Sequence, residues 1–420
     1  MSFSIASMAK AARKASFSVA NLTQQQKNDA LEAMANNLIA RTELILKENE
    51  KDLVAGRDNG LTEAMIDRLR LTPERVEDLA ASLREVATLP DPVGRMANIN
   101  IRPNGIRVGK MRIPLGVIAM IYEARPNVTA EAAALCLKSG NVVILRGGKE
   151  AINSNLVIAQ CLHEALEQQG IDPNAISVVP DPDRAVMNEL MTLSEDIDLI
   201  IPRGGEGLIR FVSENSQIPV IQHFKGVCHL YADQFADQKM ALDLLLNGKT
   251  QRTGVCNALE TLLVDKSIAD EFLPTIAKEL VAKQVVVHAC QQSLEHFKQA
   301  GCKASLATEE DWHAEYLALE IAVRVVEDFE QAISHLEEYS SGHTEVICTN
   351  DYQRANEFTR RVNSAVVMVN ASSRFSDGGQ LGLGAEIGIS TSKLHAYGPM
   401  GLESLTTEKF VVMGEGQIRS

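Results

Sequence analysis

Short, nearly continuous apolar runs recur along the middle of the chain, and stretches with helical spacing of apolar residues separate them. The first runs cover 115–122, 141–145, 176–179 and 198–201. Strands buried on both faces have this composition, and their alternation with helices is typical of parallel sheets. The sequence therefore predicts an α/β fold with a doubly wound parallel sheet. Runs at 227–231 and 258–264 begin a second set of such units, which extends to about residue 371.

The segment 16–89 has helical spacing throughout. Leu31, Met34 and Leu38 recur at positions that share one helix face. Thr72 followed by Pro73 is the signal of an N-cap and a first helical turn. A chain of 420 residues with 45% hydrophobic content is large enough for two or three domains. We expect a helical layer to precede the first sheet.

Two further segments indicate strands outside these sheets. Residues 99–114 alternate apolar and polar side chains around Asn104-Gly105, which is a hairpin signal. Residues 408–413, EKFVVM, have the pattern of a terminal strand. We expect this strand to pair with the sheet of a partner subunit.

Charge, hydropathy and cysteine spacing argue against several classes of protein. The net charge of −14 disfavours nucleic-acid binding, which depends on basic residues. No apolar run approaches the about 20 residues of a membrane helix, and the amino terminus lacks a secretory signal. Seven separate cysteines without a CxxC pair, and the absence of HExxH, predict free thiols in a reducing cytoplasm and no metal site.

Cys256 is the candidate nucleophile. It lies in the polar segment 253–257, downstream of Lys249 and Arg252 and just before an apolar run. Cationic and polar neighbours favour the thiolate form of cysteine. A small buried hydrophobe is the more common role of an isolated cysteine. We assign that role to Cys136, Cys161, Cys228, Cys290, Cys302 and Cys348.

Two glycine-rich segments are candidate anion sites. Gly204-Gly205-Glu206-Gly207 follows an apolar run and precedes a helical stretch, where glycine lets a ligand phosphate approach the backbone. Residues 372–390 are rich in Gly and Ser and contain Arg374, which suits phosphate or carboxylate. A structural turn and a flexible loop are the alternatives. Gly248-Lys249-Thr250 lacks the upstream glycine of a P-loop, so we expect no ATP site there.

Taken in order, these blocks resemble the aldehyde dehydrogenase superfamily over nearly the whole chain. The matching blocks are 114–118, 122–127, 139–141, 145–150, 201–205 and 253–257. Segments 341–345 and 398–403 resemble a narrower branch, the reductases that act on L-glutamate 5-phosphate in proline biosynthesis. The resemblance implies two doubly wound α/β domains plus a small β oligomerisation element.

The resemblance also implies roles for individual residues. Cys256 would be the nucleophile, and Asn127, with the backbone N–H of Cys256, would form the oxyanion hole. Arg146 would lie beside the adenosine ribose of the cofactor, and Glu320 would hold the nicotinamide ribose. Gly204 and Gly205 are counted with the cofactor site.

Two departures from the superfamily pattern refine the expected reaction. Lys149 replaces the usual acidic partner of the adenosine 2′-hydroxyl, and together with Arg146 it favours NADPH over NADH. Residues 223–226, HFKG, replace a segment whose glutamate activates water in hydrolytic members. Without that base, a thioester can persist until hydride or phosphate arrives.

The expected function is therefore NADPH-dependent reduction of L-glutamate 5-phosphate to L-glutamate 5-semialdehyde through a Cys256 thioester. Two alternatives stay open: a hydrolytic aldehyde dehydrogenase and a non-catalytic member of the fold. Arg125, Lys225 and Arg374 are candidates for the amino and carboxylate groups of the substrate. We also expect a homo-oligomer and possible contact with glutamate 5-kinase, since acyl phosphates are labile.

The expected domains follow from the resemblance. Segments 1–98 and 115–226 would form the dinucleotide-binding domain, and 227–400 would form the catalytic domain. Segments 99–114 and 401–420 would supply the oligomerisation hairpin and the terminal strand.

Overall fold

The computed structural model describes residues 3–419. Two compact units make up the chain. Within these residues, unit 1 comprises 3–222, 382–388 and 400–419, and unit 2 comprises 223–381 and 389–399. No helix in the described residues is both long and apolar enough to cross a membrane.

Unit 1 contains a four-stranded parallel sheet with the order β5-β4-β3-β6. Its strands are β3 (Val117–Tyr122), β4 (Val142–Gly147), β5 (Ile176–Val178) and β6 (Leu199–Arg203). Every residue of β3 and β4 is buried, which explains why these strands are continuous apolar runs. The chain moves from β3 through β4 to β5 and then returns across the sheet to β6. Right-handed crossovers therefore place helices on both faces, and the predicted double winding is confirmed.

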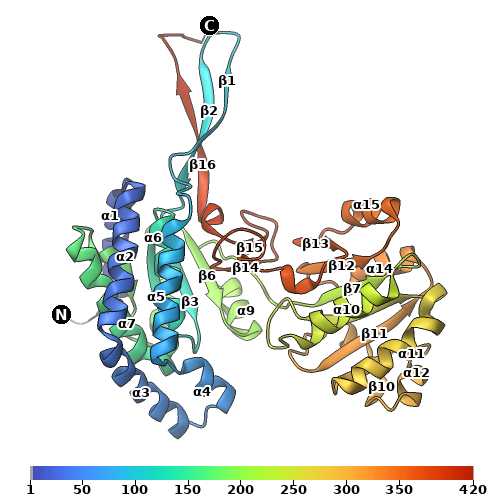
Figure 1. Cartoon of the computed structure of the whole chain (residues 1–420). Helices are drawn as coiled ribbons and strands as arrows, with labels where there is room; N and C mark the ends of the chain where they lie inside the picture. Colours follow the sequence, from blue (N-terminus) through green and yellow to red (C-terminus); the bar gives the residue numbers. More distant parts are fainter. Residues whose placement is uncertain (1–2, 420) are drawn as a thin grey trace. The chain divides into compact units, whose positions relative to one another are not determined.

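Nine α-helices belong to unit 1 within the described residues. They are α1 (Ile5–Val19), α2 (Gln24–Ala40), α3 (Thr42–Asp58), α4 (Glu63–Leu69), α5 (Pro73–Thr88), α6 (Asn127–Lys138), α7 (Ile152–Gln168), α8 (Arg184–Leu190) and α9 (Glu206–Asn215). Thr72 caps α5 by accepting a hydrogen bond from the Arg75 N–H, as the sequence predicts. α6 and α7 pack between the sheet and the outer helices α2 and α5 (Figure 1). α1 contacts α8.

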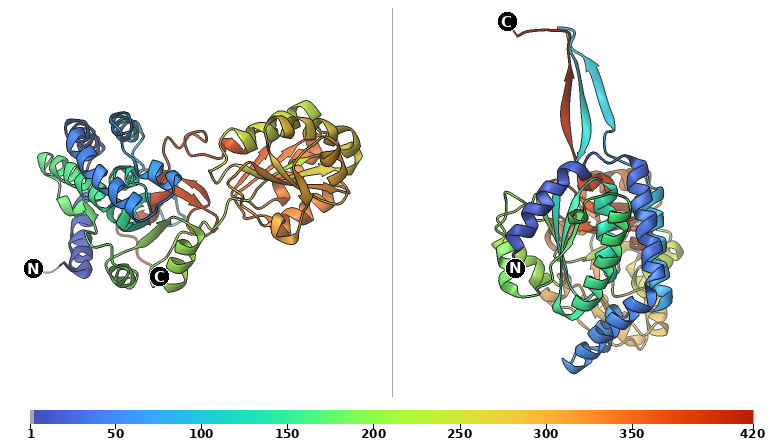
Figure 2. Two further views of the ribbon diagram at one scale, coloured as in Figure 1. Left: turned by 90° about the horizontal axis from the view of Figure 1, so that it is seen from below. Right: turned by 90° about the vertical axis from the view of Figure 1, so that its left-hand side faces the viewer.

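A three-stranded antiparallel ribbon projects from the α/β layers of unit 1 (Figures 1 and 2). It has the order β1-β2-β16, with β1 (Met96–Ile101), β2 (Arg107–Pro114) and β16 (Thr406–Met413). Gly105 takes a φ of 86° in the β1–β2 turn, which confirms the predicted hairpin. β16 pairs with β2 of its own chain over its whole length, from Thr406↔Pro114 to Met413↔Arg107. The terminal strand therefore pairs with the hairpin of its own chain, starting opposite Pro114, and its expected pairing with the sheet of a partner subunit stays a prediction.

Unit 2 contains a seven-stranded, fully parallel sheet with the order β10-β9-β11-β8-β7-β12-β13. Its strands are β7 (Cys228–Ala232), β8 (Leu259–Asp265), β9 (Val286–Ala289), β10 (Ala304–Leu306), β11 (Glu320–Val326), β12 (Thr344–Cys348) and β13 (Val366–Val369). The chain travels in one direction along the sheet from β7 to β10 and in the other from β11 to β13. This second sheet confirms the second predicted set of βα units.

Helices cover both faces of this sheet (Figure 2). They are α10 (Gln238–Thr250), α11 (Lys266–Ala282), α12 (Leu294–Gln299), α13 (Glu309–Trp312), α14 (Phe329–Tyr339) and α15 (Tyr352–Arg361). Residues of α10, α11 and α12 share one apolar core with the sheet, and residues of α14 and α15 share another. Short elements complete the chain: η1 (Lys149–Ala151), η2 (Pro173–Ala175), η3 (Ser373–Phe375), η4 (Leu402–Leu405), β14 (Gly388–Ser390) and β15 (Gly398–Met400).

Candidate active site

Cys256 lies in the loop that joins α10 to β8, just before the amino end of that strand. Its side chain is half-buried, and all seven cysteines are free thiols. Cys136, Cys161, Cys228 and Cys348 are buried, as predicted, whereas Cys290 and Cys302 are half-buried. Burial raises the pKa of the Cys161 thiol to about 11 and that of the Cys348 thiol to about 12. These two thiols are therefore protonated at neutral pH.

The segment 223–226 runs directly against the backbone of Cys256. A Cβ added to Gly226 would lie 2.1 Å from the Cys256 carbonyl oxygen and 2.9 Å from its Cα. The Gly226 N–H donates to the carboxylate of Glu315 at 3.0 Å, and the neighbouring Lys225 is half-buried. Gly226 is thus the residue that allows the nucleophile loop and this segment to touch.

Two histidines lie beside the Cys256 thiol. Ligand atoms of His223, Cys256 and His343 all lie within 4.8 Å of one another. His343 is fully buried, and burial, with a smaller contribution from His223, lowers its pKa to about 3. The imidazole of His343 is therefore neutral at physiological pH.

The turn that carries Arg374 is fastened to the same loop. The Ser373 hydroxyl donates to the Asn257 carbonyl oxygen at 2.8 Å, and the Asn257 side-chain amide donates to the Ser376 carbonyl oxygen at 2.8 Å. The Arg374 Nε donates to Gln251 at the carboxyl end of α10, at 2.8 Å. Burial and the nearby Arg252 lower the pKa of Arg374, and the negative charges of Asp377 and Cys256 partly offset this. The structure therefore places the Arg374 guanidinium within electrostatic reach of the Cys256 thiolate.

All of these residues gather at the amino edge of the unit 2 sheet. Gly226 precedes β7, Cys256 precedes β8 and His343 precedes β12, and the amino ends of parallel strands share one edge. Glu320, the first residue of β11, lies at this edge too, with its carboxylate 3.1 Å from His288 Nε2. This location differs from the carboxyl edge at which most open α/β sheets bind ligands.

A buried ion pair lies at the same edge. Lys249 Nζ and Glu260 Oε2 are 2.6 Å apart, and both side chains are fully buried. Burial lowers the pKa of Lys249 and raises that of Glu260 to about 7, and their mutual attraction opposes both changes. The charge of Glu320 also acts on Lys249. Lys249 is therefore a buried structural cation and does not project beside Cys256.

In unit 1 the predicted cofactor residues lie at the carboxyl edge of the sheet. Gly204 and Gly205 follow β6, whereas Arg146 lies near the end of β4. The chain reverses direction between β3 and β6, which is where doubly wound sheets form a crevice. The Gly205 N–H donates to the Glu123 carboxylate at 3.2 Å, and a Cβ on Gly204 would lie 2.6 Å from that carboxylate. The anionic group that lies against the backbone of this glycine turn is therefore the carboxylate of Glu123.

Arg146 is only 9% exposed, and its Nη2 donates to the Pro182 carbonyl oxygen at 2.6 Å. Its buried Nε has no hydrogen-bond partner among residues 3–419. Burial lowers the pKa of Arg146, and Glu150 is the largest opposing influence. Lys149 is exposed at the start of η1. An acceptor on a bound ligand would satisfy the Arg146 Nε.

Asn127 and Arg125 lie in unit 1, where the chain leaves β3 and enters α6. Ala124 makes this turn with a φ of 37°, an unusual conformation for a residue other than glycine. Its N–H donates to the Glu150 carboxylate at 2.6 Å. Asn127 is the first residue of α6, and its side-chain amide donates to Glu131 at 3.0 Å. Asn127 and Arg125 are both half-buried.

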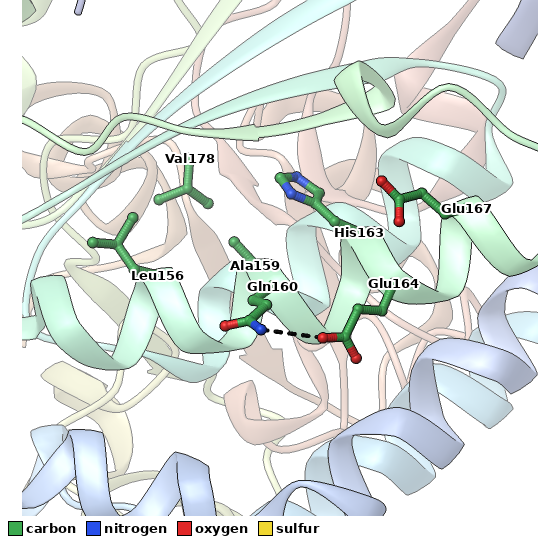
Figure 3. A pocket seen from close by; sticks show the side chains of 7 residues that line it. All are labelled: Leu156, Ala159, Gln160, His163, Glu164, Glu167 and Val178. Carbon is green, nitrogen blue, oxygen red and sulfur yellow. Dashed lines mark hydrogen bonds between the residues drawn. The ribbon is translucent and has the colours of Figure 1, made fainter.

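A separate pocket of about 380 Å³ lies along α7 in unit 1 (Figure 3). Its lining residues are Leu156, Ala159, Gln160, His163, Glu164, Glu167 and Val178. The side chains of Gln160 and Glu164 bond to each other at 3.1 Å, and His163 Nε2 lies 2.5 Å from the Ile176 carbonyl oxygen. No residue expected from the sequence to bind cofactor or substrate lines this pocket, and we assign it no role.

Several neighbours of the site were not predicted from the sequence. His223 and His343 lie in segments that the sequence comparison singled out, HFKG and SGHTE, although no role was assigned to either histidine. Glu123 and Glu150 lie in the blocks 122–127 and 145–150. These four residues could have been proposed as site residues from the sequence, because each is a titratable residue inside a segment that the resemblance singled out. Glu315 had no such signal, because its contact with Gly226 joins segments far apart in the sequence.

Comparison with known proteins bears on this geometry. Residues 3–295 match the model of the aldehyde dehydrogenase family. The chain is 60% identical over 418 residues to the gamma-glutamyl phosphate reductase of Colwellia psychrerythraea, covering 99% of each chain. It is 60% identical to the enzyme of the same name from Idiomarina loihiensis, covering 97% of each.

A solved structure agrees with these sequence matches. The crystal structure of gamma-glutamyl phosphate reductase from Thermotoga maritima superposes with a TM-score of 0.96 at 44% identity, covering 99% of this chain and 100% of that one. The predicted resemblance is thereby confirmed. The chain belongs to the aldehyde dehydrogenase family and, within it, to the gamma-glutamyl phosphate reductases.

Proposed function

We propose that the chain reduces L-glutamate 5-phosphate to L-glutamate 5-semialdehyde, with release of phosphate, in proline biosynthesis. The observation that carries the proposal is the setting of Cys256: a half-buried thiol at the edge of the sheet with Arg374 in electrostatic reach. The names of the 60% identical relatives give the substrate class.

The reaction begins at Cys256. Its thiolate attacks the acyl carbon of the acyl phosphate, the bond to the phosphate oxygen breaks, and a thioester forms. The guanidinium of Arg374 favours the thiolate and is a cation for the departing phosphate. His343 stays neutral beside the thiol because its pKa is about 3, so His343 does not form a thiolate–imidazolium pair with Cys256.

Unit 1 has the features that suit a dinucleotide. The backbone N–H groups at the amino end of α9, beside Gly204 and Gly205, would donate to its phosphates, for which the Glu123 carboxylate must move away from Gly205. The unpartnered Nε of Arg146 would donate to an acceptor of the adenosine half. Arg146 and the exposed Lys149 favour a 2′-phosphate, so we propose NADPH as the cofactor. Glu320 is proposed to hold the nicotinamide ribose. NADPH bound there would supply a hydride to the thioester carbon, after which the carbon–sulfur bond breaks to release the aldehyde and return the Cys256 thiolate.

Asn127 is proposed to stabilise the oxyanion of the tetrahedral intermediate together with the backbone N–H of Cys256. The Asn127 amide nitrogen donates to both carboxylate oxygens of Glu131 at 3.0 Å, so one of its two hydrogens must turn from Glu131 to the oxyanion. Removing one such donor typically lowers kcat by about 10²–10³. Asn127→Ala is therefore expected to lose turnover by this factor while its unfolding temperature stays near that of the parent.

Arg125, Lys225 and Arg374 remain the candidates for substrate binding, and as cations they suit the carboxylate group of the substrate. Arg125 is half-buried in unit 1, Lys225 is half-buried beside Gly226, and Arg374 is anchored to Gln251. A carboxylate bound by one of these cations would lose affinity on removal of the charge. Substitution to Met should therefore raise KM most for the residue that holds the carboxylate. Arg374→Met should in addition lower kcat, because Arg374 favours the thiolate.

The wider setting is proposed as follows. Segments 1–98 and 115–226 bind the dinucleotide, and 227–400 carry the catalytic thiol. The ribbon of β1, β2 and β16 (segments 99–114 and 401–420) mediates homo-oligomerisation, since β16 is an edge strand among the described residues and exposes Phe410 and Val412. Seven free thiols suit the reducing environment of the cytoplasm.

Contact with glutamate 5-kinase would shield the labile acyl phosphate from water during its transfer to this chain.

The reverse reaction tests the proposal. Semialdehyde and NADP⁺ should give sustained NADPH formation only when inorganic phosphate is added, because phosphate is needed to release the thioester. Equal steady-state rates with and without phosphate would favour the hydrolytic alternative. Glu315 is the carboxylate to test in that case, since it contacts the segment that lacks a glutamate, and Glu315→Gln would then slow phosphate-independent turnover.

A further inference from the structure

His223, Cys256 and His343 bring three metal-ligating atoms together at the amino edge of the unit 2 sheet. All three atoms lie within 4.8 Å of one another. His343 is completely buried, and its Nε2 has no hydrogen-bond partner among the described residues. A buried ring nitrogen without a partner is costly, and its retention here points to a ligand for that nitrogen.

The surroundings of His343 determine which ring nitrogen has a lone pair to offer. Nδ1 lies 2.7 Å from the Thr344 hydroxyl, which itself donates to the Ser376 hydroxyl at 2.8 Å. Nδ1 also lies 3.7 Å from Cys228 Sγ, which donates to the Cys256 carbonyl oxygen at 3.3 Å. Because both neighbours use their hydrogens elsewhere, Nδ1 carries the ring proton. Nε2 therefore presents its lone pair.

The Thr344 hydroxyl also fixes the orientation of the ring. Metal-ligating histidines almost always donate their other N–H to an oxygen in this way, which sets the tautomer and raises the basicity of the ligating nitrogen. The Thr344 hydroxyl is itself held by its hydrogen bond to the Ser376 hydroxyl. His343 is thus already arranged as a ligand.

The chemical nature of the three ligands selects the metal. Two imidazoles and one thiolate suit Zn²⁺ and other thiophilic divalent ions better than Mg²⁺ or Ca²⁺, which prefer oxygen. Tetrahedral zinc at its usual bond lengths holds N and S ligands about 3.3–3.6 Å apart. Atoms already within 4.8 Å reach that separation by side-chain rotation, since His223 and Cys256 are both half-buried.

We propose that His223, Cys256 and His343 form a binding site for Zn²⁺ or a similar thiophilic divalent cation, and that the bound cation inhibits the enzyme by occupying the nucleophile. The thiol proton is released when the sulfur binds the metal. The sulfur can then neither attack an acyl carbon nor react with an alkylating agent. Binding rests on the geometry alone, whereas inhibition also rests on the proposed role of Cys256.

Titration of the full chain with Cd²⁺ tests binding without reference to turnover. One Cd²⁺ per chain should produce a thiolate-to-metal charge-transfer band in the ultraviolet, and excess Zn²⁺ should remove it. The band should be absent in Cys256→Ser and unchanged in Cys302→Ser, the control at a half-buried thiol in the α12–β10 connection. Affinity should fall by about tenfold or more in His223→Asn, since even outer-shell changes cost 10–100-fold.

A second measurement follows the thiol itself. Zn²⁺ should slow alkylation of Cys256 by iodoacetamide and inhibit turnover, and a chelator should restore both. The site is refuted if Cys256→Ser retains the Cd²⁺ band or if His223→Asn binds Cd²⁺ as tightly as the parent. His343→Asn adds a second test of the ligand set, but His223 is half-buried and gives a decisive variant that does not disturb the core. Alkylation that Zn²⁺ leaves unchanged would refute the inhibitory role of the site.

Discussion

Gly226 should be a residue on which turnover depends although it has no side chain. Its missing Cβ would lie 2.1 Å from the Cys256 carbonyl oxygen, 2.8 Å from its carbonyl carbon and 2.9 Å from its Cα. Ordinary contacts of this kind begin at about 3.4 Å. All three clashing atoms are backbone, so the Gly226→Ala variant must displace the nucleophile loop or the segment 223–226 by about 1 Å.

A displacement of this size is large for catalysis and modest for stability. Misplacing reacting groups by about 1 Å can lower the rate by about 10². Overpacking of a well-packed region typically costs about 1–3 kcal/mol of unfolding free energy. Gly226→Ala is therefore expected to fold, to unfold at a somewhat lower temperature, and to lose about 10² in kcat.

The assay is phosphate-dependent NADPH formation from semialdehyde and NADP⁺, with thermal unfolding measured in parallel. Gly254→Ala is the matched control, because Gly254 lies in the same loop, yet a Cβ there would meet no atom within 4 Å. The control should keep its kcat within about twofold of the parent. If Gly226→Ala folds and also keeps its kcat within about twofold, the reasoning about loop contact is refuted.

Three other perturbations give independent tests. Lys249→Met should lower the unfolding free energy by about 3–5 kcal/mol, because it leaves the Glu260 carboxyl buried without its cationic partner. Lys249→Met combined with Glu260→Leu should recover much of this loss, and equal melting temperatures for parent and single variant would contradict the reasoning. Burial lowers the pKa of His343 from 6.5 to about 3, so between these pH values the unfolded chain binds a proton that the folded chain does not. The free energy of unfolding is therefore unaffected by the titration of His343 above pH 6.5 and falls as the pH drops from 6.5 toward 3. Urea unfolding followed by the fluorescence of Trp312, the single tryptophan, should show this loss, and His343→Gln should weaken it; an unchanged pH dependence would contradict the assignment. Lys149→Glu should lower the ratio of kcat/KM for NADPH over NADH by about tenfold, and an unchanged ratio would remove Lys149 from the cofactor site.

The sheets could be predicted from the sequence because strands buried on both faces consist of continuous apolar residues. β3 and β4 are buried at every position, so no polar residue interrupts the runs 117–122 and 142–147. The Thr72-Pro73 start of α5 and the Gly105 turn were also predictable, since each depends on local backbone chemistry. The order of the strands in each sheet could not be predicted from the sequence, because it depends on contacts between segments far apart in the chain.

The nucleophile could be predicted, but its surroundings could not. Cys256 lies among residues of a recognisable block, whereas His343 reaches it from the start of a different strand. A cluster assembled from positions 223, 256 and 343 has no spacing that a metal or catalytic motif would show. The expectation of no metal site rested on motif spacing, which is silent about ligands brought together by a parallel sheet.

The surroundings of Lys249 also differ from what the sequence led us to expect. Its position upstream of Cys256 favoured the interpretation that it supports the thiolate. In the folded chain it is completely buried and paired with Glu260 at 2.6 Å. Lys249 lies in the last turn of α10, and helix packing turns its side chain toward β8. Arg374, more than a hundred residues downstream, supplies the cation near Cys256 instead.

The most direct test of the central claim is the mass of the protein after reaction with semialdehyde and NADP⁺ in the absence of phosphate. Acid quenching protonates the substrate amine and keeps it from attacking the thioester. We predict one glutamyl adduct per chain on the peptide that contains Cys256, and its disappearance when phosphate is added before the quench. An unmodified Cys256 peptide under conditions that yield NADPH, or an adduct on another residue, would contradict the account.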